Sequence, residues 1–200
     1  MLRLCLLGVL SLTAAGPDKE PPYQLPMPGG WRKETFSLPP SFAPDMKWKG
    51  EEELRFAPGM FKANAPDFLS YAFLFWLTDD ANIDANTLQR ELLAYYRGLA
   101  SAVSKSRKRP VNTNGFQLTI SPSKEKPDKR PGGEVVAGYM GELSWTEPFT
   151  TGKPQNLHLE IEGWQSGNKH RCVFVCASPL PETAAVWKTL REIRAGCTCR

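Results

Sequence analysis

Between residues 115 and 178 the chain contains a series of short segments with the composition of β-strands, separated by turn-forming residues. In the segment 115–123, for example, Phe116, Leu118 and Ile120 alternate with polar residues. Successive side chains of a β-strand point to opposite faces, so a half-buried strand produces this period of two. Three more such segments follow, at residues 134–145, 156–164 and 170–178. Consecutive strands joined by turns predict an antiparallel sheet.

The first half of the chain adds three strands. A short strand over Glu34–Leu38 is stopped by two prolines, and another over Glu52–Phe56 is halted by a Pro-Gly pair. The third segment, Phe68–Thr78, is rich in aromatic residues without a helical stripe. We interpret it as a fully buried strand, with a core helix as the alternative.

Two helices are expected. The first begins at an aspartate cap, Asp84 or Asp80, and ends in a basic run, residues 105–109, before Pro110. Its apolar positions recur at spacings of three and four: Leu88, Leu92, Tyr95, Leu99 and Val103. The basic run complements the exposed carbonyls of a helix end, and nucleic-acid binding is its alternative reading. The second helix begins at Pro181 and reaches Gly196, which suits the position after a helix end.

The order of these elements is three strands, a helix, four strands and a helix. Antiparallel strands with segregated helices define an α+β fold. We therefore expect an antiparallel sheet of about six to seven strands with two main helices packed on it. The 200 residues, of which 41% are hydrophobic and 23% charged, suit one globular domain, assigned to residues 31–200.

This order resembles the Mog1/PsbP-like fold, in which helices flank an antiparallel sheet. The entry "QLPMPGGW" before a short strand and the last helix "VWKTLREI" look like the first and last elements of such domains. The resemblance covers most of residues 23–195 in topology. It carries over no catalytic residue, and it implies a binding or assembly module rather than an enzyme.

The N-terminus indicates export. Residues 1–15 combine Arg3, an apolar run over Leu4–Leu12 and small residues before Gly16, as a secretory signal peptide does. Residues 16–30 form a Pro-rich lead-in. No later segment is long and apolar enough to span a bilayer, so we expect a periplasmic or secreted protein. The formal charge of +4 is too small to predict a nucleic-acid partner.

Few residues offer catalytic chemistry. The sequence contains no phosphate-binding loop, dinucleotide fingerprint, nucleophile elbow or zinc-protease motif, and we expect no cofactor and no bound metal. On the strand 156–162, His158, Glu160 and Glu162 share one face, but the outer two lie ~13 Å apart. A wetted polar face is the expected role; an acid–base pair or metal site is the alternative.

Two tryptophans are candidates for binding. Trp31 and Trp48 lie in proline-rich, loop-like surroundings, where an exposed indole can stack on a sugar or anchor a peptide. Packing in the core or at its rim is nevertheless the favoured use of these rings.

Four cysteines gather near the C-terminus: Cys172, Cys176, Cys197 and Cys199. The first two lie ~13 Å apart if residues 170–178 form a strand, which is too far to share a zinc ion. The last helix returns over this strand, which brings its end near Cys172. We therefore predict a disulfide from Cys172 to Cys197 or Cys199, worth ~3 kcal/mol. Cys176 is then a buried thiol, or it pairs with the remaining tail cysteine.

These inferences favour an exported binding or assembly module without catalytic activity, whose partner is a protein or another component of the cell envelope. The alternative is a secreted or periplasmic hydrolase that uses the histidine and carboxylates of the 156–162 strand. A concave pocket at His158 or Glu160 would favour the hydrolase, and an exposed aromatic patch near Trp31 and Trp48 would favour the module.

Overall fold

A computed structural model describes residues 22–78, 81–124, 133–166 and 170–199 of the chain. The expected signal peptide lies outside these residues, as does most of the charged loop after Lys124. The described elements are β1 (Tyr23–Gln24), β2 (Arg32–Leu38), β3 (Gly50–Phe56), β4 (Tyr71–Leu77), α1 (Ala85–Arg107), the 3-10 turn η1 (Thr113–Gly115), β5 (Gln117–Pro122), β6 (Gly133–Thr146), β7 (Pro154–Ser166), β8 (His170–Ser178), α2 (Ala185–Ala195) and β9 (Thr198–Cys199).

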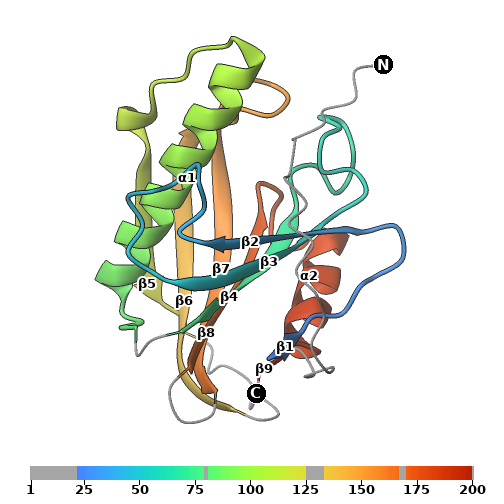
Figure 1. The fold of residues 1–200 in the computed structure, drawn as a ribbon. Coiled ribbons are helices and arrows are strands. Elements are labelled where there is room, and N and C mark those ends of the chain that lie inside the picture. Colours follow the sequence, from blue (N-terminus) through green and yellow to red (C-terminus); the bar gives the residue numbers. More distant parts are fainter. Residues whose placement is uncertain (1–21, 79–80, 125–132, 167–169, 200) are drawn as a thin grey trace, which may run out of the picture.

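Seven strands form one antiparallel sheet with the order β2-β3-β4-β8-β7-β6-β5 (Figure 1). The predicted α+β class is confirmed, and each of the four strands predicted between residues 115 and 178 is a strand of this sheet. The segment predicted at Phe68–Thr78 contains the interior strand β4 and not a helix. Its residues are buried on both faces, which explains a continuous apolar run without alternation.

The helix α1 covers one face of the sheet. Asp84 caps it as predicted, because its carboxylate accepts the Thr87 N–H at 2.7 Å. Within the predicted apolar stripe, the first three residues are buried and the last two are only partly buried. Nearer the C-terminal end, Tyr96 and Ala100 face the core instead. Between α1 and the sheet, the aromatic rings of Phe73 and Phe75 on β4 pack against Tyr95 of α1.

The helix α2 covers the other face, over β4 and β8. It begins at Ala185 and not in the turn of Pro181, because residues 181–184 form a separate turn closed by the Ala184 N–H and the Pro181 carbonyl. Gly196 ends the helix, but its backbone is right-handed. Close packing explains this glycine: a Cβ atom there would lie 2.6 Å from Cγ of Pro26.

The Pro-rich lead-in belongs to the fold from residue 22 onward. Its strand β1 pairs with β9 at the other end of the chain, which places Tyr23 opposite Cys199. Buried Arg55 of β3 donates hydrogen bonds to the carbonyls of Leu25 and Pro26, each at 2.9 Å. Strands of two residues are too short to show an alternation of apolar and polar residues, so the sequence did not predict this two-stranded sheet.

Candidate functional site

The strands β5 and β6 extend beyond α2, and on the α2 face Thr119 and Ser121 of β5 are exposed while Met140 of β6 is partly exposed. At the boundary lies an open pocket of about 510 Å³, which we call the α2 cleft. Its lining comes from four elements: the end of β5 and the residues after it, the middle of β6, the middle of β7, and α2 with the turn before it. These residues are Ser121–Lys124, Gly138–Met140, Glu160–Glu162, Glu182, Arg191 and Arg194.

The floor of the α2 cleft is a network of ion pairs. Glu160 accepts Nε of Arg191 at 3.0 Å and Nη1 of Arg194 at 2.9 Å. Nε of Arg194 also lies 3.0 Å from Glu162 Oε1. Both carboxylates are nearly buried, at 9% and 8% side-chain exposure. Buried charges need such partners, since an unpaired carboxylate would lose its hydration without compensation.

Local periodicity explains how this network forms. Glu160 and Glu162 are two residues apart on β7, so they share a face, as predicted. Arg191 and Arg194 are three residues apart on α2, so they share a side of the helix. The hydrogen bond to Glu160 raises the pKa of Arg191, which keeps its guanidinium charged.

His158 does not join this site. It lies two residues before Glu160 on the same face of β7, half-buried, and does not line the α2 cleft. Its neighbours across the sheet are Glu142 and Ser178. The structure therefore brings the two predicted carboxylates together with arginines rather than with the histidine.

The two candidate tryptophans are placed differently. Trp48 is only 3% exposed and packs edge-to-face on Phe75, with ring centroids 5.6 Å apart. Its loop is held to α1 by Glu91, which accepts the backbone N–H groups of Lys47 and Trp48. Trp48 is therefore a core residue and is not exposed for binding, because a buried carboxylate of the helix fixes a proline-rich loop inward. Trp31 is half-buried against the core under α2.

The cysteines confirm the predicted staple. A disulfide joins Cys172 to Cys199, across 27 residues of sequence, and so ties β9 to the sheet. Cys176 is buried as expected, and its thiol donates to the Leu190 carbonyl at 3.4 Å. Cys197 is buried in the same cluster of residues. Within the described ranges, no group of three histidine, cysteine or acidic side chains is placed to hold a metal ion.

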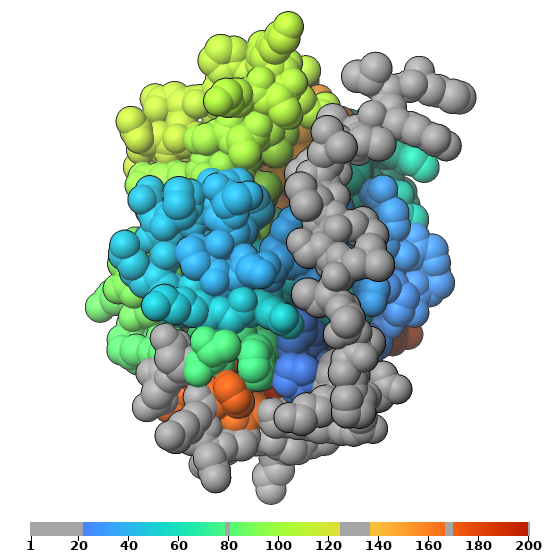
Figure 2. Space-filling model, viewed as in Figure 1, coloured from blue at the N-terminus to red at the C-terminus, as the bar shows by residue number. Residues whose placement is uncertain are grey.

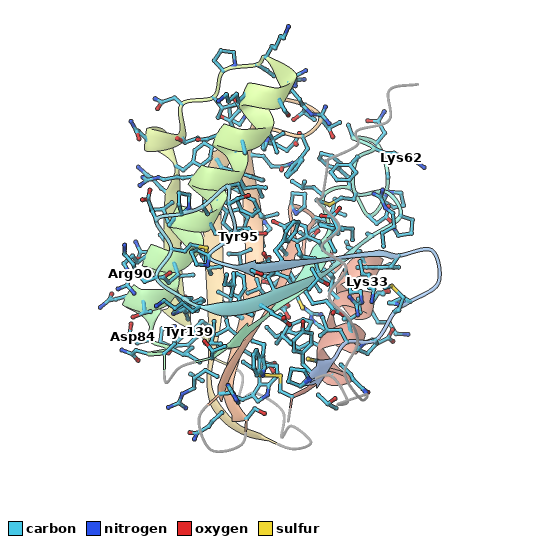
Figure 3. All side chains as sticks on the ribbon, viewed as in Figure 1. Lys33, Lys62, Asp84, Arg90, Tyr95 and Tyr139 are labelled. Carbon is cyan, nitrogen blue, oxygen red and sulfur yellow. A yellow bond between two sulfur atoms is a disulfide. The ribbon has the colours of Figure 1, made fainter. Side chains whose placement is uncertain are left out.

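A buried carboxyl of β3 was not anticipated. Glu52 is fully buried between the sheet and α1, where the Tyr95 hydroxyl donates to its Oε1 at 2.8 Å (Figure 3). Burial raises the pKa of this carboxyl to about 8, while the hydrogen bond from Tyr95 acts in the opposite direction. Oε2 has no hydrogen-bond partner among the described residues. Glu52 lies two residues before Leu54 on a predicted strand, so the two share a face, and this spacing could have indicated that Glu52 is buried. The run of three glutamates suggests a solvated surface instead.

No family model, curated protein or solved structure matches this chain. None of the helices in the described part of the chain is both long enough and apolar enough to cross a bilayer.

Proposed function

We propose that the chain is an exported, non-catalytic binding or assembly module that receives its partner in the α2 cleft. The observation that carries this proposal is the cleft itself: an open pocket of about 510 Å³, within the size range of ligand sites, with charged groups already fixed in its floor. Preorganised polar groups favour binding, because little ordering is required when a partner arrives.

The state of Glu160 supports binding over catalysis. Its two oxygens accept hydrogen bonds from Nε and Nη2 of Arg191 and from Nη1 of Arg194. A general base or nucleophile needs a lone pair directed at its substrate. To act in that way, Glu160 would have to give up charge-assisted hydrogen bonds in a nearly buried position.

Arg191 gives the cleft a preference for acidic partners. Its guanidinium uses Nε and Nη2 on Glu160, and no described residue accepts a hydrogen bond from Nη1. The side chain is 42% exposed and lies over the Trp187 ring, 5.6 Å from its centroid. Lys124 adds a further cation to the lining, and Glu182 places an exposed carboxylate there. A protein segment with an acidic side chain or a free C-terminus is the partner class that this chemistry suits.

Two features support the proposed location outside the cytoplasm. The N-terminal sequence predicts a signal peptide, and the disulfide between Cys172 and Cys199 is compatible with an oxidising compartment.

The test uses two matched tryptophan substitutions on β5. Ser121 lines the cleft, whereas Thr119 lies two residues earlier, exposed on the same face but outside the lining. Residues 16–200 serve as bait in a cross-linked pull-down from an extract of the native compartment. A partner captured by the wild type and by T119W, but lost with S121W, supports the proposal. Equal capture by S121W would show that the partner binds outside the α2 cleft. If the wild type captures no partner, the proposed binding function is contradicted.

The hydrolase remains the second candidate because Glu160 and Glu162 both line the cleft. A panel of ester, amide and glycoside substrates distinguishes the two functions. Turnover by the wild type that disappears in Glu160→Gln but persists in T119W would favour the hydrolase. We expect no turnover by either protein.

A further inference from the structure

Three segments that are distant in the sequence meet at one end of the molecule (Figure 1). They are the loop 57–69 between β3 and β4, the end of α1 with residues 105–111, and the loop 147–153 between β6 and β7. We call this region the basic end.

Side-chain contacts connect the three segments. The rings of Phe61 and Phe149 lie 5.6 Å apart between centroids, which joins the loops 57–69 and 147–153. Nη1 of Arg109 donates to the Thr150 carbonyl at 3.3 Å, which joins the end of α1 to the same loop. The surface is therefore continuous although its residues come from three parts of the chain.

The charges exposed at the basic end have one sign. Two carboxylates occur in these segments, and both are engaged by backbone N–H groups: Asp67 accepts from Gly59, and buried Glu147 accepts from Thr150 and Thr151. The cations are all exposed: Lys62, Lys105, Arg107, Lys108, Arg109 and Lys153. Figure 3 shows Lys62 at the periphery, away from the sheet.

A helix end accounts for only part of this charge. Cations in the last turn of α1 stabilise its exposed carbonyls, by about 0.3–1 kcal/mol each. Lys62 and Lys153 lie in loops of their own and have no helix end to complement. Their addition to the run of residues 105–109 therefore indicates a surface that attracts anions.

An aromatic side chain accompanies the cations. Phe61 is 42% exposed, although large apolar side chains of this protein are mostly buried. The Arg32 guanidinium lies over its ring, 5.4 Å from the centroid. At the end of α1, Lys105, Lys108 and Arg109 line an open depression of about 400 Å³. An exposed ring next to several cations is the combination found where proteins enter the interface of anionic membranes.

We propose that the basic end docks this protein on an anionic bilayer surface, with Phe61 in the interfacial layer and the surrounding cations on lipid phosphates. A bilayer fits better than nucleic acid, because single-stranded nucleic acids bind along grooves that carry successive aromatic platforms. The basic end instead gathers loop tips and a helix end at one pole, where Figure 2 shows the end of α1 as the uppermost coloured part of the molecule. Phe61 is the well-exposed ring among its described residues. A planar surface can contact all three segments at once.

The test measures co-sedimentation with vesicles of equal parts phosphatidylglycerol and phosphatidylcholine, using residues 16–200. That chain retains every described element and lacks the apolar run of residues 4–12, which would itself enter lipid. A basic residue near an anionic surface contributes about fivefold to partitioning. The variant K62Q/K105Q/K153Q should therefore lose on the order of a hundredfold, and F61A about tenfold. Raising the salt from about 0.1 to about 1 M should also release the protein.

Matched controls remove the same groups elsewhere. K47Q/K49Q/K188Q deletes three exposed lysines outside the basic end, and M27A truncates the other well-exposed large apolar side chain. Both should bind vesicles like the wild type, and thermal unfolding should show that all four variants are folded. Equal binding to pure phosphatidylcholine, or equal loss in the control triple variant, would overturn the proposal. So would binding to a single-stranded oligonucleotide without binding to vesicles.

Discussion

Changing Glu52 to glutamine should abolish the pH dependence that this residue gives to folding stability. The glutamine keeps an oxygen that can accept the hydrogen bond from Tyr95, which lies at 2.8 Å in the wild type, but it cannot ionise. Its amide NH₂ replaces an oxygen that has no partner among the described residues, so the variant also loses a constant amount of stability.

The magnitude follows from linkage between proton binding and folding. The pKa of Glu52 rises from 4.5 in the unfolded chain to about 8 in the folded protein, mainly because burial disfavours the carboxylate. Below pH 4.5 both states hold the proton. Between the two values only the folded state holds it, so the free energy of unfolding falls as pH rises. At 1.36 kcal/mol per tenfold change, the loss reaches about 5 kcal/mol above pH 8.

The assay is urea unfolding of the oxidised protein at several pH values from 4.5 to 9. Stability of E52Q relative to the wild type should rise by about 5 kcal/mol across this range, because only the wild type loses the Glu52 contribution. E192Q is the control, since Glu192 on α2 is 63% exposed and should follow the wild type. If the E52Q and wild-type curves stay parallel, the carboxyl is not held neutral, and the argument from burial fails.

Three further substitutions test the disulfide, one ion pair of the α2 cleft and the hydrogen bonds of Glu91. Changing Cys199 to serine removes the disulfide to Cys172, and chemical denaturation should show a loss of about 3.5 kcal/mol for a loop of 27 residues. A reductant should destabilise the wild type equally and leave this variant unchanged. Changing Arg194 to methionine should cost about 3 kcal/mol, because it removes a 2.9 Å ion pair from nearly buried Glu160; an unchanged unfolding midpoint would show that the pair contributes little. Changing Glu91 to alanine should cost about 2–3 kcal/mol and speed hydrogen exchange of the two backbone amides that it accepts.

The sheet could be predicted from the sequence because its information is local. Alternation in the segment 156–164 assigned Leu159 to one face and Glu160 to the other, and both lie where this pattern put them. Asp84 marked the start of α1 because an N-cap bond spans only three residues. The disulfide was accessible too, since strand and helix lengths bring the tail back to Cys172.

The candidate site was accessible only in part, because its chemistry depends on residues far apart in the chain. The pattern grouped Glu160 with Glu162, but nothing local to β7 indicates that Arg191 would bind there, 31 residues later. The inward turn of Trp48 likewise depends on a carboxylate of α1, 43 residues away. Local patterns specify the face on which a side chain lies, whereas its partner depends on which surfaces pack together.

The pairing of β1 with β9 has a consequence for the order in which the protein folds during synthesis. Tyr23 meets Cys199 in this pairing, so every residue between them must be synthesised before the contact can form. The disulfide that holds β9 also requires Cys199. Until then the lead-in has no strand to pair with, and Arg55 can be the first to hold it through the carbonyls of Leu25 and Pro26. Removal of β9 would therefore leave β1 without its partner strand and would also remove the disulfide to Cys172.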